Sequence, residues 1–470
     1  MSDAYTHALS LAIEQTSPAT FRRVPPLDEL YASPESEDSR IALARFCHDM
    51  YRGDQLRHLP RLTGESSLEH SRRAHKSFLN VTRVVIDVLS QLYRRPVTRK
   101  LSGDDAAAKT IARAFASNPT AQLMLTVDRM TRLQGVCALR VSYQGAEVRF
   151  WPYPAHRLIV LPDPALPLMP QCVIAFAASE DARTPLAHVW TAEKIATVAN
   201  GRIVAEAEHG LGRVPFVFFH DRLPLDGFWV EGRGRSLCHA NAEFNAKLSE
   251  LAYTIAMQGF GVMEIVNPDP TRNIEIGPGR AIAFNVSGNT PYGVDFKSPK
   301  APIGELLADL EFCLRTLLKT QRVPESVLSV NVGANASGVS ILAAQSPVLE
   351  DRVERMSLFR SAEQDLVNCT LAVLREHEGM RGDVQVALDF PEPQLEQSLS
   401  ERMAVDAWKL QQGLITPWEI MLRDDPDAFT DIEDGMSGSA SERDAQCAPT
   451  QTRLWRNGLE AQWRPTHEEV

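Results

Sequence analysis

GRGRSLCHANAEFNAKLSELAYTIAM, residues 232–257, has apolar side chains at the spacing of one helical face, and PIGELLADLEFCLRTLLKTQR, residues 302–322, repeats that pattern. The apolar positions of the first stretch are Leu237, Phe244, Leu248, Leu251 and Ile255. Those of the second are Leu306, Leu310, Cys313, Leu314 and Leu317, with Glu305, Glu311, Arg315, Lys319 and Arg322 on the opposite face. Such stripes predict two amphipathic helices of about twenty residues, each roughly 30 Å long.

The region between the two helices, residues 259–302, has a different character. Short β-prone runs, such as Val262–Val266, alternate with the turn-forming sequences NPDP, GPG, SGN and SPK. This pattern predicts a small sheet at the tip of a two-helix stalk. A stalk has few neighbours within its own chain, so further copies of the chain could cover its stripes. An ordinary insertion packed on the chain's own body fits equally well, because periodicity shows that a face is buried but not against what.

Composition sets the broad class of the protein. The 470 residues, 44% hydrophobic and 23% charged, suit a globular protein of two or three domains. Seven scattered cysteines without a CxxC pattern predict reduced thiols and no metal site. A net charge of −11 argues against tight clamping of nucleic acid, although nucleic acid could still slide past. No apolar run is long enough to span a membrane and no signal peptide is recognisable, so a cytoplasmic origin is expected.

The remaining patterns predict an α+β fold. Helices are expected in the first 35 residues, at 41–51, at 78–95 before Pro96, and on both sides of Asn118-Pro119 up to Gly135. Antiparallel strands are expected between 136 and 219, with turns at Gln144-Gly145 and Asn200-Gly201. A long helix to about Glu378 should kink or break at Pro347. A strand at 384–390, helices at 392–412 and 417–423, and a disordered tail at 431–470 complete the prediction.

No catalytic constellation is recognisable, so we expect no enzyme and no cofactor. The glycine-rich EGRGRS (231–236) lacks the strand and the GxGxxG pattern of a dinucleotide site, and GPGR (277–280) lacks the Lys-Ser/Thr of a phosphate loop. GANASG (333–338) does not form a GxSxG elbow. An enzyme whose catalytic groups converge from distant segments remains an alternative.

The order of elements resembles the portal proteins of tailed bacteriophages. The similar stretches are VTRVVIDVLSQLYRRPV (81–97), VCALRVSYQGAEVRFWPYPAHRLIVLPDP (136–164), LGRVPFVFFHDRLPLDG (211–227), ASGVSILAAQSPVLEDRVERM (336–356) and LQQGLITPWEIM (410–421). No single one of these stretches is diagnostic, and the resemblance covers roughly residues 40–425. It implies a portal-like fold with a β-rich wing, a two-helix stem, a small α/β clip, a long kinked wing helix and an α-helical crown.

The resemblance also assigns parts of the chain. The wing would comprise residues 1–230, the stem 231–258 and 303–322, and the clip 259–302. The tunnel loop, long helix and wing strand would lie in 323–390, the crown in 391–430 and the tail in 431–470. Stem packing between subunits would use Leu237, Phe244, Leu248, Leu251, Leu306, Leu310, Leu314 and Leu317. The polar stem face would carry Arg315, Lys319 and Arg322, which suit the C-terminal end of a helix dipole.

The loop at 330–340 is rich in small residues, which suits either a plain connector or a narrow passage. Under the resemblance it would be the tunnel loop, with Asn331, Gly333, Asn335, Ala336, Ser337 and Gly338 in the DNA channel. The family forms rings, usually dodecameric, at one capsid vertex, through which double-stranded DNA is packaged and ejected. The implied partners are further copies of the chain, terminase, major capsid protein and head-completion or adaptor proteins, with no membrane. The implied location is the virion, after assembly in the host cytoplasm. A minor capsid or scaffold protein of similar layout is the main alternative.

Overall fold

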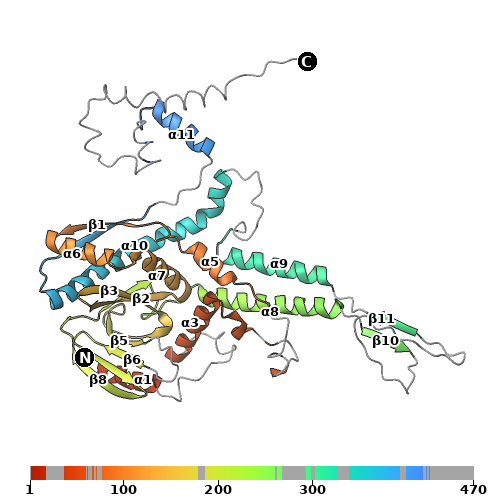
Figure 1. The fold of residues 1–470 in the computed structure, drawn as a ribbon, viewed down its shortest axis with the longest axis horizontal. Coiled ribbons are helices and arrows are strands. Elements are labelled where there is room, and N and C mark those ends of the chain that lie inside the picture. Colours follow the sequence, from red (N-terminus) through yellow and green to blue (C-terminus); the bar gives the residue numbers. More distant parts are fainter. Residues whose placement is uncertain are drawn as a thin grey trace. The chain divides into compact units, whose positions relative to one another are not determined.

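The computed structural model describes residues 2–16, 36–59, 61, 66–67, 70, 77–177, 186–259, 262–266, 293–297, 302–324, 338–391, 399–415, 420 and 423. The chain divides into two compact units, Met1–Glu392 and Pro393–Val470. The first unit combines helices with antiparallel sheets (Figure 1). The predicted α+β class is therefore confirmed.

Two antiparallel sheets form the β-rich part of the first unit. The smaller has the order β3-β2-β9, from Glu147–Pro154, Val136–Gln144 and Phe216–His220. The larger is a meander of β4 (Leu158–Pro162), β5 (Pro170–Phe176), β6 (Leu186–Trp190), β7 (Lys194–Ala199) and β8 (Arg202–Glu208). The turn predicted at Asn200-Gly201 is present, and the one predicted at Gln144-Gly145 lies one residue later, at Gly145-Ala146. Positive φ angles occur at Gly145 and Ala146 in one turn and at Asn200 and Gly201 in the other, as two-residue hairpin turns require.

The two sheets pack face to face, and helices cover both outer sides. One buried cluster contains Val136 and Phe216 of the smaller sheet together with Val160 and Val173 of the larger one. The outer face of the larger sheet is covered by α1 (Ser2–Gln15). On the smaller sheet lie α6 (Asp105–Ala116) and α7 (Thr120–Gln134), and α10 (Gly338–Glu378) packs on this layer.

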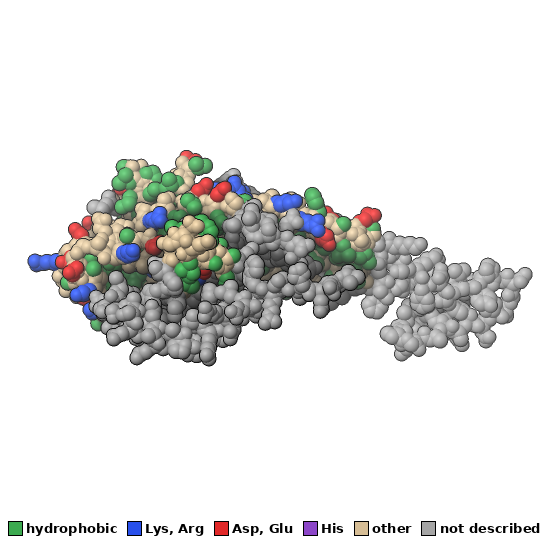
Figure 2. Space-filling model, turned by 90° about the horizontal axis from the view of Figure 1, so that it is seen from above, with side chains coloured by type: hydrophobic (Ala, Val, Ile, Leu, Met, Phe, Trp, Pro, Cys, Tyr) green, Lys and Arg blue, Asp and Glu red, His purple; other side chains and the backbone are tan. Residues whose placement is uncertain are grey.

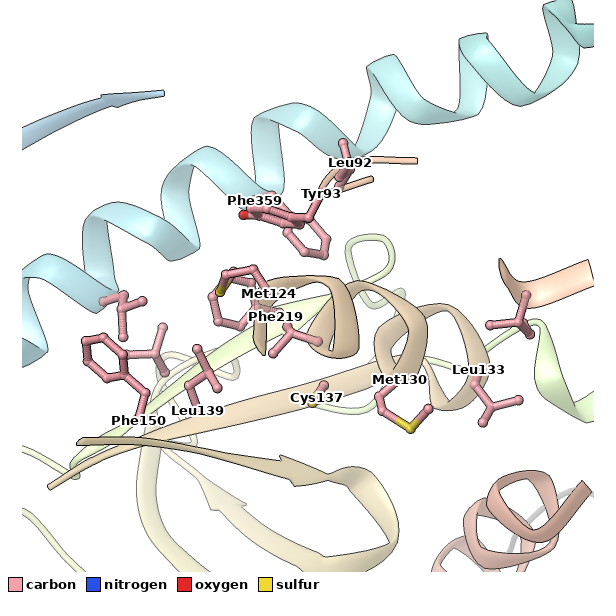
Figure 3. Packing of buried hydrophobic residues seen from close by; sticks show 14 of the residues in the cluster. Leu92, Tyr93, Met124, Met130, Leu133, Cys137, Leu139, Phe150, Phe219 and Phe359 are labelled. Carbon is pink, nitrogen blue, oxygen red and sulfur yellow. The ribbon is translucent and has the colours of Figure 1, made fainter. Parts of the chain in front are cut away.

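The main core lies between the smaller sheet and its helices. Figure 3 shows Phe359 of α10 directed towards Met124 of α7 and Phe219 of β9. The Phe219 and Phe359 rings are 5.4 Å apart. The same core includes α3 (Glu37–Arg52) and α5 (Val81–Leu89), with η1 (Gln55–His58) between them, while η2 (Ala155–Arg157) links β3 to β4. Helix positions within the core thus depend on one shared apolar layer.

One strand pairing was not predicted, and one predicted helix is shorter than expected. β1 (Thr98–Gly103) pairs antiparallel with β12 (Val384–Asp389). The helix expected to continue to Pro96 stops at Leu89. The N–H and the hydroxyl of Ser90 both donate to Ile86 O. The helix does not continue into a further turn, because Leu92 N donates to Asp128 Oδ2 of α7 and not to a backbone carbonyl of α5. The expected extent of this helix was wrong because a distant carboxylate competes for its backbone.

The long helix α10 is helical on both sides of Pro347, so an interruption there was wrong. Val348 and Asp351, which follow the proline, are buried against the body and hold this part of the helix in place. In the second unit, α11 (Leu399–Gln411) lies within the helix expected at 392–412, and residues 392–398 lie outside the described residues. Arg423 forms an ion pair of 2.6 Å with Asp406 within that unit. The tail at 431–470 lies outside the described residues.

Two helices extend away from the sheets (Figure 1). α8 (Gly234–Gly259) and α9 (Ile303–Thr320) contact each other side by side. Between them in sequence, β10 (Val262–Val266) and β11 (Gly293–Lys297) form an antiparallel pair. The other residues expected to form the tip, 260–261, 267–292 and 298–301, lie outside the described part of the chain. Among the described helices, none is long and apolar enough to cross a membrane.

Candidate assembly surface

The first half of α8 belongs to the body of the protein. Leu237, Cys238 and Ala242 lie in the main core. A polar row at spacing i, i+4 and i+8 binds the start of α5 and the chain that precedes it. Asn241 Oδ1 accepts from Thr82 N at 3.0 Å, Asn245 Oδ1 from Leu79 N at 2.9 Å, and Ser249 Oγ from Ser77 N at 3.1 Å. This row was not predicted from the sequence, although residues at this spacing lie on one helical face.

Close approach of the backbone explains the glycine-rich EGRGRS. A Cβ on Gly232 would lie 2.3 Å from Gly135 N, and one on Gly234 would lie 2.2 Å from Leu133 O. Arg233 N donates to Arg132 O at 3.0 Å in the same place. The glycines therefore let the start of α8 pack on the end of α7.

A buried network of charges joins the base of α8 to α7 and α10. Arg132 contacts Asp221 at 3.1 Å and also pairs with Asp351, while Arg233 is 2.5 Å from Asp351. Burial, followed by the nearby Arg355, lowers the pKa of Arg132 to about 9. The network links three segments that are distant in sequence.

Arg355 completes this network from α10. It lies 2.5 Å from Asp128 and 2.9 Å from Asp221. All three side chains are at most 3% exposed. Three arginines and three aspartates thus neutralise one another, which burial in a low-dielectric interior requires. This fixes the direction in which the helix pair leaves the body.

The two helices cover each other's apolar stripes along most of their contact. Phe244, Leu251 and Leu310 are buried between them, with Leu248 and Leu314 partly buried in the same cluster. Leu237 and Leu317 pack into the main core. Of the two alternatives that the sequence left open, cover within the same chain therefore holds for these residues. Packing of these residues between subunits stays a prediction. Of the eight residues named for it, Leu306 is the most exposed, at 37%.

Some apolar residues of the two helices remain open, which we call the outward set: Tyr253, Leu307 and Phe312, together with Ile255 and Leu306 of the predicted stripes. Phe312 is 68% exposed and Tyr253 is 44% exposed. Each lies two residues beyond a leucine of the shared contact, Leu310 or Leu251, and hence about 200° around its helix. The two aromatic side chains therefore lie on opposite outer sides of the helix pair.

Charged side chains surround the outward set. Lys247 of α8 reaches Asp309 of α9 at 2.7 Å, and this hydrogen bond raises the pKa of Lys247. Of the predicted polar face, Arg315 is 3.5 Å from Glu311 on the same helix, Lys319 lies in the last turn of α9, and Arg322 follows the helix with φ 58. Figure 2 shows hydrophobic, basic and acidic side chains next to one another along this part of the surface.

Residues 330–337 of the predicted tunnel loop lie outside the described residues, whereas residues 338–340 form the start of α10. In the described part of the chain no group of three or more His, Cys, Asp or Glu side chains could hold a metal ion. The six cysteines described there are free, and all except Cys313 are buried. Burial raises the pKa of Cys137, Cys172 and Cys369 to about 12, so these thiols stay protonated at neutral pH.

No protein-family model matches the chain, and no curated protein matches it. Among solved structures, one similar chain comes from "Neck of empty GTA particle computed with C6 symmetry", with 15% identity and a TM-score of 0.41, covering 77% of this chain and 95% of that one. Another comes from "Virion of native gene transfer agent (GTA) particle", with 13% identity and a TM-score of 0.39, covering 79% of this chain and 97% of that one. A third comes from "Neck of native GTA particle computed with C12 symmetry", with 13% identity and a TM-score of 0.39, covering 72% of this chain and 88% of that one.

Proposed function

We propose that this chain is a portal-type protein of a tailed-phage-like particle. Copies of it form a closed ring, usually dodecameric in the family that the sequence resembles, at one vertex of the capsid. The ring is a conduit for double-stranded DNA during packaging and ejection. It is also the docking platform for terminase, for the major capsid protein and for head-completion or adaptor proteins.

The observation that carries the proposal is the position of the outward set. Phe312 on α9 and Tyr253 on α8 lie on opposite sides of one helix pair. A contact between two such different faces is heterologous, and repeated contacts of this kind close into a ring when the rotation allows. A twofold dimer would instead need one self-complementary face. The arrangement therefore favours cyclic assembly over simple dimerisation.

Two further features suit a ring with a DNA channel. The glycine contacts and the buried charge network fix the base of the helix pair, so each copy presents its outward residues in the same place. The net charge of −11 disfavours tight retention of DNA, which a conduit must release. The small and uncharged residues of 330–340 supply the narrowest part of the channel in this proposal.

The contact type can be tested by mixing two variants, Phe312→Glu and Tyr253→Glu. Each chain alone keeps one face and loses the other, so each should be a monomer by native mass spectrometry. Mixed in equal amounts, the intact α9 face of one variant meets the intact α8 face of the other, and a heterodimer should form and stop there. If Phe312→Glu alone formed a dimer, the contact would be isologous and the ring proposal would fail.

Val204→Glu is the matched control, because Val204 on β8 is 67% exposed, close to the 68% of Phe312. This variant should still form the closed rings expected of the unmodified chain in negative-stain images. Loss of rings in Val204→Glu would mean that any added surface charge prevents assembly. An unmodified chain that stays monomeric across salt and protein concentrations would also contradict the proposal.

The DNA-conduit part has its own test. Ala336→Trp, in the proposed tunnel loop, should leave ring formation unchanged and sharply reduce the DNA content of assembled particles. The reason is that a ring of indoles would narrow an aperture that small side chains keep open. Particles that carry the substitution and package DNA at the parental level would make residues 330–340 a plain connector.

A further inference from the structure

A cleft of about 530 Å³ opens between α3, the end of α7 and the chain that leads into α8. Its volume is in the range of about 300–1,000 Å³ that is typical of ligand pockets. Leu43, Ala44 and Leu133 contribute an apolar lining, and Gln134, Trp229 and Arg235 contribute polar groups. None of these residues belongs to the outward set. The cleft is thus a separate surface near the base of the helix pair.

Two polar side chains of this cleft carry a buried atom without a hydrogen-bond partner among the described residues. Gln134 is 8% exposed. Its Nε2 is 2.8 Å from Ala44 O and 2.9 Å from His156 Nδ1, and these contacts fix the orientation of the amide. The carbonyl Oε1 of Gln134 is left unpaired, and so is the indole Nε1 of Trp229. An unpaired buried donor and an unpaired buried acceptor both cost free energy, so a ligand that pairs them is favoured.

The charges of the cleft are already balanced within the chain. Arg40 stacks on Trp229, with its guanidinium 3.6 Å from the ring centre, and pairs with Glu37 at 2.7 Å. Arg235 pairs with Glu231 at 2.8 Å. A charged ligand would have to separate these pairs. The chemistry therefore favours an uncharged ligand that offers one donor, one acceptor and an apolar group.

A peptide group next to an aliphatic side chain has this combination. We propose that the cleft binds an extended, uncharged peptide segment of another polypeptide chain, with an aliphatic side chain against Leu43, Ala44 and Leu133. A backbone N–H of the segment donates to Gln134 Oε1, and a backbone carbonyl accepts from Trp229 Nε1. The two lining helices, α3 and α7, use their backbone groups in their own hydrogen bonds, so on that side the segment binds through side chains.

The smallest probe of this chemistry is N-isobutylacetamide, which has one peptide group and one leucine-like branch. Its matched control is isobutyl acetate, in which an ester oxygen replaces the N–H. Both are titrated against the full-length chain by saturation-transfer NMR. The amide should bind saturably and about threefold to tenfold more tightly than the ester, as one hydrogen bond to a buried acceptor predicts. Equal affinities, or no saturable binding of the amide, would overturn the proposal.

Variants locate the contact. Gln134→Leu should abolish the preference for the amide over the ester, whereas Trp229→Phe should weaken both ligands, because both carry the carbonyl. Trp190→Phe is the control, since Trp190 Nε1 is also buried and unpaired but does not line this cleft. A preference that persists in Gln134→Leu would refute the assignment.

The source of the segment has a separate test. Residues 17–35 are replaced by a Gly/Ser sequence of equal length in the otherwise complete chain. If another polypeptide is the partner, the affinity for N-isobutylacetamide should stay unchanged. An affinity that rises more than threefold would show that the chain's own residues compete for the cleft, and the proposal of an outside partner would be wrong.

Discussion

Replacing Arg355 by leucine should destabilise the first unit by about 3–5 kcal/mol, the usual cost of removing one partner from a buried ion pair. The side chain of Arg355 is 3% exposed and lies 2.5 Å from Asp128 and 2.9 Å from Asp221. Leucine cannot compensate either carboxylate. Asp128 would retain its bond from Leu92 N, and Asp221 would retain Arg132 at 3.1 Å. Because these contacts remain, we expect the lower half of the range.

The assay is urea unfolding followed by tryptophan fluorescence, in a Phe312→Glu background so that assembly does not add to stability. With an m-value of about 3 kcal/mol/M, the upper value for small proteins, a loss of 3 kcal/mol moves the midpoint by about 1 M. Arg375→Leu is the matched control. Arg375 is 2.6 Å from Asp383, but these side chains are 47% and 93% exposed, so its removal should cost at most about 1 kcal/mol.

Midpoints that agree within error for Arg355→Leu and Arg375→Leu would refute the reasoning. The buried network would then contribute no more than a surface ion pair. A large effect at both positions would also contradict it, because exposure would then not determine the cost. The comparison therefore tests burial itself as the origin of the stabilisation.

Three other substitutions test the base of the helix pair and the adjacent cleft. Gly232→Ala should cost at least about 1–3 kcal/mol in urea unfolding, because its Cβ would meet the backbone, whereas Gly304→Ala, with no atom within 4 Å, should be neutral or stabilising. Asn241→Leu should cost about 2–4 kcal/mol in the same assay, since it leaves Thr82 N and Leu79 O without their partner. Burial, followed by the neighbouring His48, holds the pKa of His156 well below 6.5. As the pH falls below 6.5, the unfolded chain therefore binds a proton at His156 before the folded chain does, and the free energy of unfolding decreases. The His156→Gln variant should lose less of its free energy of unfolding between pH 7.5 and 5.5 than the unmodified chain. An unchanged pH response in His156→Gln, or equal costs for the two glycine variants, would contradict the respective argument.

Local signals in the sequence predicted much of the element order. The helix break at Asn118-Pro119 and the helix end at Gly135 are both present, because these residues act on the backbone next to them. The Asn200-Gly201 turn is present for the same reason, since both residues adopt positive φ readily. Such positions need no knowledge of the rest of the fold.

Pairing between strands that are distant in sequence was harder to predict. The strand at 384–389 was expected, but its partner TRKLSG (98–103) has few apolar residues and alternates between exposed and half-buried positions. An edge strand of this kind has no hydrophobic pattern to identify it. The early end of α5 depends on Asp128, a side chain of another helix. Neither feature follows from periodicity within one window.

At the candidate assembly surface, periodicity again predicted which helix face is buried but not what covers it. The stripe of Leu237, Phe244, Leu248 and Leu251 correctly predicted a buried helix face, yet it did not distinguish a neighbour in the same chain from one in another copy. Of the residues that remain open, Ile255 and Leu306 were part of the predicted stripes, whereas Tyr253, Leu307 and Phe312 were not and were absent from the sites named from the sequence.

The position of Phe312 changes the physical argument for assembly. Stripes that are already covered give no reason to associate, because their apolar area is lost from water within one chain. Phe312 and Tyr253 retain 68% and 44% of their exposure, so association still removes apolar area at these two places. Tyr253 belongs to α8, whose start is held by close glycine contacts and a buried ion pair, and Phe312 belongs to α9, which packs along α8. A rigid base keeps the two faces at a constant angle, and only a constant angle between heterologous contacts can close a ring instead of producing an open chain of mixed length. Destabilising the base through Gly232→Ala should therefore broaden the distribution of assembly sizes even when Phe312 and Tyr253 are intact. A sharp ring population in that variant, with the fold otherwise preserved, would mean that the geometry of the ring is set at some other contact.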